Sequence, residues 1–272
     1  MKKPYVRRIL IIVLSLIIAV CAGIIIWKLA TDARDKADNN ELRSIKNSAP
    51  TESTRPPIPS DVTIPSKPGP IVPPDAPVDE QKIMSQLKGL YELNNDLVGW
   101  IEIPGTQISY PVVQSKYEAN YYLRRNFYKK NATCGTIYVR EACDVFKPSD
   151  NLTIYGHKMR NGTMFADLHE YKEKDFWEGH RYIYFDTLYE YHTYEVFAAF
   201  QITVDLANGF NYHLFDDAKN AAEFDEFVRQ CKELSYFDTG ITPEYGEKLI
   251  TLSTCDKTID DGRFVVVARR VN

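Results

Sequence analysis

The chain opens with a long hydrophobic run that differs sharply from everything after it. Residues Ile9 to Trp27 read ILIIVLSLIIAVCAGIIIW, nineteen positions without a charged side chain. At about 1.5 Å per helical residue, such a run spans the roughly 30 Å hydrocarbon core of a bilayer. The pattern predicts a transmembrane helix within residues 1–30.

Basic residues cluster on the N-terminal side of this run. Lys2, Lys3, Arg7 and Arg8 precede it, whereas the basic residues after Trp27 are mixed with aspartates. The positive-inside rule therefore predicts a cytoplasmic N-terminus and an extracellular remainder. A cleaved signal peptide is the alternative, but signal h-regions usually span only about 7 to 15 residues and no small-x-small site follows Trp27. The sequence favours a retained, single-pass membrane anchor.

A polar segment and then a proline-rich segment follow, together residues 31–77. The stretch APTESTRPPIPSDVTIPSKPGPIVPPDAP, Ala49 to Pro77, holds ten of the fifteen prolines. Proline lacks a backbone donor and fixes φ, so this stretch cannot build a core and favours extended backbone. We expect residues 31–77 to form an extracellular stalk.

From Val78 to Asn272 the pattern becomes that of a globular domain, long enough to bury a sizeable core. Its first residues, DEQKIMSQLKGLYELNND, have apolar positions at helical spacing and predict one or two short helices. Eight later runs are rich in β-branched and aromatic residues and are bounded by turn residues. They read GWIEI, ISYPVVQ, GTIYVR, NLTIYGH, RYIYFD, YEYHTYEVFAAFQI, KLITLSTC and RFVVVARRV. The pattern predicts a mainly β fold with added helices, a closed or nearly closed eight-stranded barrel.

One further helix is predicted between the sixth and seventh strands. In DDAKNAAEFDEFVRQCKELSYF, the apolar residues Phe224, Phe227 and Cys231 fall on one face. Asp216 or Asp217 is the expected N-cap, because a carboxylate there accepts from unpaired backbone amides. Cys231 is accordingly expected to be a core residue of this helix.

Composition excludes several classes of function. The net charge of −4 and the pI near 5.8 argue against nucleic acid as a partner, since phosphate binding needs a basic face. Five cysteines are too few for a disulfide framework, although a bridge between Cys134 and Cys143 stays open. No CxxC or CxxH pair indicates a zinc site, and Asp256, Asp260 and Asp261 are more simply solvated than bound to calcium. No metal or organic cofactor is expected.

The most informative stretch is the strand KLITLSTC, which ends in Cys255. Strand alternation places Ser253 and Cys255 on its more polar face, which argues against a purely structural thiol. A loop closing on Gly262 would pair this strand with the next as an antiparallel hairpin, with Arg263 beside Cys255. A guanidinium there favours the thiolate and can hold an oxygen that becomes negative during acyl transfer. The pair therefore indicates a nucleophilic cysteine.

A cysteine nucleophile usually works with a histidine, and the chain has five. His157 ends NLTIYGH, where a predicted strand runs out through Gly156 into a polar turn, and working residues tend to lie at such edges. The others are expected in a short helix (His169), before a strand (His180), within a strand (His192) and in a connection (His213). Position favours His157 and leaves open both the other four and a site without histidine.

These motifs together resemble the class B sortases, the membrane-anchored cysteine transpeptidases of Gram-positive bacteria. The resemblance is carried by TLSTC with an arginine eight residues on, by the upstream YGH and by LVGWIEIPGTQISYPVVQ, and covers about Val78 to Asn272. It implies a closed sortase-type β-barrel with N-terminal helices and a long helix between strands six and seven. It also implies Cys255 as nucleophile, His157 as acid and base, Arg263 as a clamp for the oxyanion or substrate backbone, and Ser253 in a supporting role.

The resemblance further implies cleavage of a C-terminal sorting motif on exported surface proteins, NPxTN-like or S/PPxTG-like, through a thioester at Cys255. The acyl group would pass to an amine of a peptidoglycan precursor or a pilin. Two other interpretations stay open: an extracellular cysteine protease or thiol hydrolase, and a non-catalytic stalked β-domain that binds a surface ligand. The last predicts a buried, inert Cys255.

Overall fold

A computed structural model describes residues 3–50, 55, 82–204, 209–256 and 258–272. The chain divides into two compact units, Met1–Glu41 and Leu42–Asn272. Helix α1 (Lys3–Ser48) contains the predicted hydrophobic run and is long and apolar enough to cross a membrane. The proline-rich segment 49–77 lies outside the described residues, apart from residues 49, 50 and 55.

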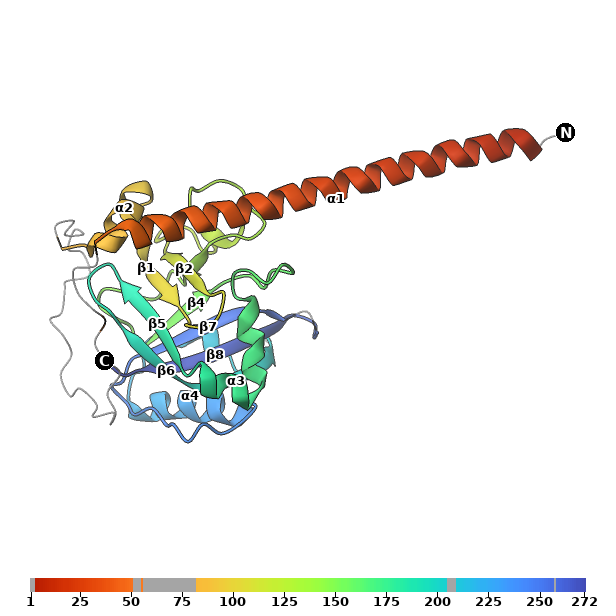
Figure 1. Cartoon of the computed structure of the whole chain (residues 1–272). Coiled ribbons are helices and arrows are strands. Elements are labelled where there is room, and N and C mark those ends of the chain that lie inside the picture. The colour runs from red at the N-terminus through yellow and green to blue at the C-terminus, as the bar shows by residue number, and fades with distance from the viewer. Residues whose placement is uncertain (1–2, 51–54, 56–81, 205–208, 257) are drawn as a thin grey trace. The chain divides into compact units, whose positions relative to one another are not determined.

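The second unit is built on a closed barrel of eight strands (Figure 1). Around the barrel the order is β1-β2-β3-β4-β7-β8-β6-β5, in which β2–β3 and β4–β7 are parallel and the other pairs antiparallel. The strands are β1 (Leu97–Glu102), β2 (Ser109–Val113), β3 (Ile137–Val139), β4 (Asn151–Tyr155), β5 (Tyr182–Thr187), β6 (Thr193–Thr203), β7 (Leu249–Asp256) and β8 (Gly262–Arg270). Each overlaps one predicted run, so the predicted eight-stranded barrel is confirmed.

The main hydrophobic core fills the barrel and continues beneath helix α4 (Ala221–Leu234). Strand β6 is buried at eight consecutive positions instead of alternating, because α4 packs against it from outside (Figure 1). Phe224 and Cys231 of α4 are fully buried in this core. The prediction that Cys231 is a core residue is confirmed.

The N-cap predicted for α4 is wrong. The helix begins at Ala221, and the side chain of Asn220 accepts from the backbone N–H of Glu223 at 3.1 Å. Asp216 is instead engaged by Arg140, and Asp217 accepts from the backbone N–H of Asp150 at 2.9 Å. Both aspartates bind residues far away in the sequence, so neither is available to cap the helix.

A second hydrophobic cluster lies on the outer side of β1 and β2, against the helices that precede them. It comprises Leu42, Ile83, Leu87, Leu90, Leu97, Trp100, Val113, Tyr122, Phe127, Tyr138 and Leu188. Leu87 and Leu90 come from α2 (Ser85–Leu93), which confirms a short helix there. Arg43, near the end of α1, donates from Nε to the carbonyl oxygen of Ser109 and from Nη2 to that of Gln107, both at 2.8 Å. The last turns of α1 are therefore bound to the barrel.

The connections are short helices and turns. They include the 3-10 helices η1 (Tyr121–Arg124), η2 (Ala166–Lys172) and η3 (Tyr212–Leu214), and the helix α3 (Lys174–Gly179). The short helix predicted around His169 is η2, but α3 was not predicted. His192 lies in the turn before β6 and not within a strand, because that strand begins at Thr193. Each of the five cysteines is a free thiol.

Candidate active site

Cys255 lies near the end of β7, between β4 and β8. It is the one residue of β7 that is not buried. The pairing of β7 with β8 sets Cys255 directly opposite Arg263, as predicted from the hairpin. Residues directly opposed in an antiparallel pair have Cβ atoms about 5 Å apart. The thiol and the guanidinium therefore start from neighbouring positions at an accessible edge of the barrel.

The loop between these strands closes on Gly262 because no larger residue fits there. A Cβ atom on Gly262 would lie 2.5 Å from the carbonyl oxygen of Asp256 and 2.4 Å from Cγ1 of Ile259. The side chain of Arg263, which is half-buried, donates from Nη1 to the carbonyl oxygens of Gly262 at 2.9 Å and Asp261 at 3.3 Å. The guanidinium is thus held near its own backbone.

His157 is brought to Cys255 by the parallel pairing of β4 with β7. The pairing runs as far as Tyr155 opposite Ser253, and the backbone N–H of Gly156 extends it by donating to the carbonyl oxygen of Ser253 at 3.1 Å. His157 and Cys255 each follow two residues after the last pair. Because adjacent strands lie about 4.8 Å apart, a continuation of this register would bring position 157 next to position 255. The Nε2 atom of His157 lies 2.7 Å from the carbonyl oxygen of Leu123 in η1.

Glycine is required at position 156. A Cβ atom there would lie 2.4 Å from Cδ1 of Ile137 and 2.6 Å from Cδ2 of Phe165, closer than atoms of packed side chains approach. The backbone N–H of Phe165 also donates to the carbonyl oxygen of His157 at 2.9 Å. The backbone at Gly156 and His157 is therefore packed tightly against β3 and against the turn that contains Phe165.

Ser253 is buried beneath the site and does not reach the surface. Its side chain is hydrogen-bonded to the hydroxyl of Tyr212 at 2.8 Å, and only 1% of the residue is exposed. Burial raises the pKa of Tyr212 to about 12, with Arg263 and Cys255 acting on the same phenol electrostatically. Tyr212 is a residue of the site that sequence reasoning missed, because it lies in η3, whose contacts with β7 are formed only by the fold.

His169 approaches the site from the other side. Its ring stacks on Phe264 at 4.6 Å between centroids, and Nδ1 lies 3.6 Å from Oδ2 of Asp256. Burial lowers its pKa to about 4, assisted by Lys158. His169 is therefore neutral near pH 7 and packs beside Asp256, the residue that follows the cysteine.

Asp256 was expected to be solvated, and this is wrong. The residue is 2% exposed, and Oδ1 accepts from the backbone N–H and the hydroxyl of Thr258 at 2.9 and 2.7 Å. The last residue of β7 turns its carboxylate inward, because it organises the first turn of the loop. Among the described residues, no three His, Cys, Asp or Glu side chains come together as a metal site.

The three remaining histidines have other partners. His180 stacks on Phe176, with ring centroids 4.0 Å apart. The Nε2 atom of His192 lies 3.1 Å from the carboxylate of Glu190. His213 packs edge-on against Tyr212, at 5.4 Å between centroids. Strand register therefore distinguishes His157 from them.

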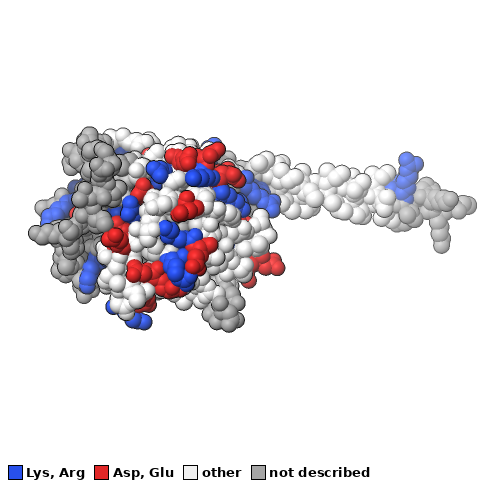
Figure 2. Space-filling view, turned by 90° about the horizontal axis from the view of Figure 1, so that it is seen from below, with Lys and Arg blue, Asp and Glu red and all other residues white. Residues whose placement is uncertain are grey.

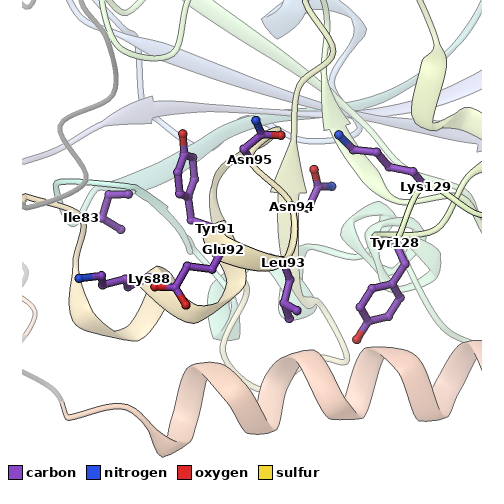
Figure 3. Close-up of a pocket in the computed structure, with 9 residues that line it drawn as sticks. All are labelled: Ile83, Lys88, Tyr91, Glu92, Leu93, Asn94, Asn95, Tyr128 and Lys129. Atoms are coloured by element: carbon purple, nitrogen blue, oxygen red, sulfur yellow. The ribbon is translucent and has the colours of Figure 1, made fainter.

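A hollow of about 370 Å³ lies at the start of β1 (Figure 3). One of its polar lining residues is satisfied within the protein: the side-chain amide of Asn94 donates to the hydroxyl of Tyr122 and the carbonyl oxygen of Phe127, each at 2.9 Å. Tyr122 in turn donates to Asp96 at 2.6 Å. Since the next residue, Leu123, contacts His157, this network braces η1 behind the candidate site.

Charges on the surface are mixed. On the face shown in Figure 2, lysine and arginine alternate with aspartate and glutamate and no extended basic area is visible. A nucleic-acid partner needs such an area to neutralise phosphates.

Comparison with known proteins gives the family. A family model described as a sortase domain matches residues 101–271. A sortase B of Listeria monocytogenes is 32% identical over 192 residues, covering 70% of this chain and 76% of that protein. The chain is a class B sortase. Sortases are cysteine transpeptidases, so the non-catalytic surface-binding interpretation is set aside.

Solved sortase B structures share the barrel. One from Bacillus anthracis superimposes with a TM-score of 0.71 at 30% identity, covering 88% of this chain and 97% of that one. A Staphylococcus aureus sortase B–substrate complex has a TM-score of 0.64 at 29% identity, covering 71% and 88%. The mainly β sortase barrel with added helices is thus confirmed for this chain.

Proposed function

We propose that this sortase is a single-pass membrane enzyme with a cytoplasmic N-terminus, which cleaves a sorting motif near the C-terminus of exported proteins and joins the acyl part to an amine. Support for the anchor comes from α1, whose hydrophobic residues are exposed to solvent, Trp27 to 70%. The basic residues ahead of the run support the orientation.

Cys255 is the proposed nucleophile. Its thiolate attacks the carbonyl carbon after the threonine of the motif and forms a C–S bond, and Arg263 stabilises the oxygen that becomes negative. His157 gives a proton to the departing amine as the C–N bond breaks, and a thioester remains. An acceptor amine then attacks the thioester, His157 takes its proton, and the thiolate of Cys255 leaves. Ser253 supports the strand that carries the thiol, through its bond to Tyr212.

One observation carries this proposal. Cys255 alone in β7 is accessible, with Arg263 opposite it on β8 and His157 two residues beyond the end of β4, the other neighbouring strand. A structural cysteine would instead be buried, as Cys231 is.

The candidate sorting motif and the candidate acceptor amine are inferred from membership of the sortase B family. NPxTN-like and S/PPxTG-like peptides are the candidate donors. A peptidoglycan amine or a pilin lysine is the candidate acceptor, and a related sortase B structure was solved with triglycine. We favour a peptidoglycan amine because a glycine amine is present in that related complex.

The test uses the full chain in detergent micelles with each candidate peptide, and mass spectrometry of the intact protein. The expected result is an adduct equal to the peptide up to its threonine, located at Cys255 and absent from Cys255→Ala. Triglycine should discharge the adduct as a new peptide product. Hydrolysis of the adduct by water, at a rate that no added amine changes, would favour the thiol hydrolase. An adduct that still forms in Cys255→Ala would refute Cys255 as the nucleophile.

A further inference from the structure

Arg55 occupies a complete binding site on the hairpin that joins β5 and β6. Its Nη2 atom lies 2.7 Å from both carboxylate oxygens of Asp186, and Nη1 donates to the carbonyl oxygen of His192 at 3.2 Å. The guanidinium lies over the ring of Tyr184, 3.8 Å from its centroid, and 5.2 Å from that of Tyr191. A carboxylate, a carbonyl and two aromatic rings together match the charge and planar shape of a guanidinium. We call these four residues of the hairpin the arginine socket.

The carboxylate in the socket requires a cation. Asp186 is 2% exposed, and an unpaired carboxylate buried to this degree is costly. Burial raises its pKa, while Arg55 opposes the rise by charge and by hydrogen bonds. The other charges that act on it, Lys46 and Glu102, have opposite effects. Among the described residues, Arg55 is the cation hydrogen-bonded to this group.

The socket adjoins the place where the end of α1 is bound. Asp186 lies directly opposite Trp100 in the pairing of β5 with β1. The ammonium group of Lys46 lies over the ring of Trp100, 5.1 Å from its centroid, and pairs with Glu102 at 3.6 Å. The chain is thus bound to neighbouring positions of the barrel both before and after residues 49–54.

We propose that the arginine socket is an attachment site for the chain's own proline-rich segment, and that it fixes where this segment leaves the barrel. The occupant is Arg55. Such an attachment fixes the position of Arg55 on the barrel, next to the end of α1.

The attachment does not depend on the catalytic proposal. Strand β6 begins at Thr193, next to the socket, and nine residues later Ile202 pairs with Arg263. These nine steps of extended chain cover about 30 Å. The socket and Cys255 therefore lie near opposite ends of the strand, and release of Arg55 leaves the catalytic edge unchanged.

The experiment measures how well Arg55 holds the segment in the full chain, in detergent micelles. If Arg55 is held in the socket, release of Arg55 should speed cleavage after Glu52, three residues away, by a glutamate-specific protease. We expect Arg55→Ala to speed this cleavage about tenfold, and Arg55→Lys about threefold, because lysine keeps the charge without the planar stacking. Arg229→Ala, which removes an exposed arginine of α4, is the matched control and should change nothing.

Asp186→Asn completes the test as a double-mutant cycle. If Arg55 acts through Asp186, the double variant should be cleaved no faster than the faster single variant. Equal cleavage of wild type and Arg55→Ala would overturn the proposal, even if Asp186→Asn does not fold. Turnover of a free sorting peptide by Arg55→Ala should stay within about twofold of wild type. A larger loss of turnover would contradict the separation of the socket from the catalytic edge.

Discussion

His169 should make the barrel less stable at mildly acidic pH. Its side chain is 9% exposed, between Phe264 and Asp256, and burial lowers its pKa to about 4 from the ordinary 6.5. Lys158 and Lys172 act in the same direction and Asp256 against it. The folded protein therefore binds this proton less readily than the unfolded chain does.

The sign and size of the effect follow from proton linkage. A folded-state pKa below the unfolded one means that stability is complete above about pH 6.5 and is lost as pH falls towards 4. A pKa of about 4 in place of 6.5 corresponds to about 3 kcal/mol at the acid end, and to about 1 kcal/mol at pH 5.5. Asp256, whose pKa is lowered despite its burial, loses its contribution only below the ordinary range of aspartate.

The measurement is urea unfolding of the full chain in micelles at pH 8 and pH 5.5, followed by fluorescence of the buried Trp100 and Trp177. The loss between the two pH values should be about 1 kcal/mol smaller in His169→Gln than in wild type. His169→Phe, which keeps a ring beside Phe264 and binds no proton, should show the same reduction. The pKa values of His192 and His213 are also lowered by burial, and they contribute equally to all three proteins. An identical loss in wild type and both variants would refute the reasoning.

Three further changes test the site. Arg263→Lys keeps the charge without the planar fork and should slow adduct formation at least about a hundredfold, measured by stopped reactions and mass spectrometry; an unchanged rate would remove the proposed oxyanion role. Gly156→Ala places a Cβ 2.4 Å from Ile137 and should lower the free energy of unfolding by about 1–3 kcal/mol, with activity falling as well. An unchanged free energy of unfolding would show that the side chain of Ile137 moves to make room. Tyr212→Phe leaves the buried Ser253 hydroxyl without its partner and should cost about 1–2 kcal/mol by urea unfolding, whereas adding Ser253→Ala should recover part of it.

Much of the barrel could be predicted because its signals are local. All eight strands overlap runs of β-branched and aromatic residues, which favour a pleated, packed surface. The pairing of Cys255 with Arg263 was predictable too, because a hairpin's register follows from its loop. His157, chosen from its position, lies two residues beyond the end of β4, which pairs with the strand that carries Cys255. Catalytic roles for these three residues stay predictions until the adduct is measured.

What could not be predicted depends on contacts between distant segments. Tyr212 reaches Ser253 across 41 positions of the chain, and no periodicity in either segment reports this contact. Asp256 resembled a solvated loop residue, yet it is buried beside η2. The N-cap of α4 was assigned wrongly for the same reason, since Arg140 and the backbone of Asp150 engage the aspartates that a local rule would choose.

The sequence by itself determined the hydrophobic run, the eight strands and the cysteine–arginine hairpin, because short-range pattern and chain direction are enough for these. Only the tertiary structure decided which buried polar groups pair, how the thiol is supported from beneath, and that Arg55 fits a socket more than a hundred residues away in the chain. A buried charge or hydroxyl takes whichever partner the fold brings within hydrogen-bonding distance, and that choice is made in three dimensions.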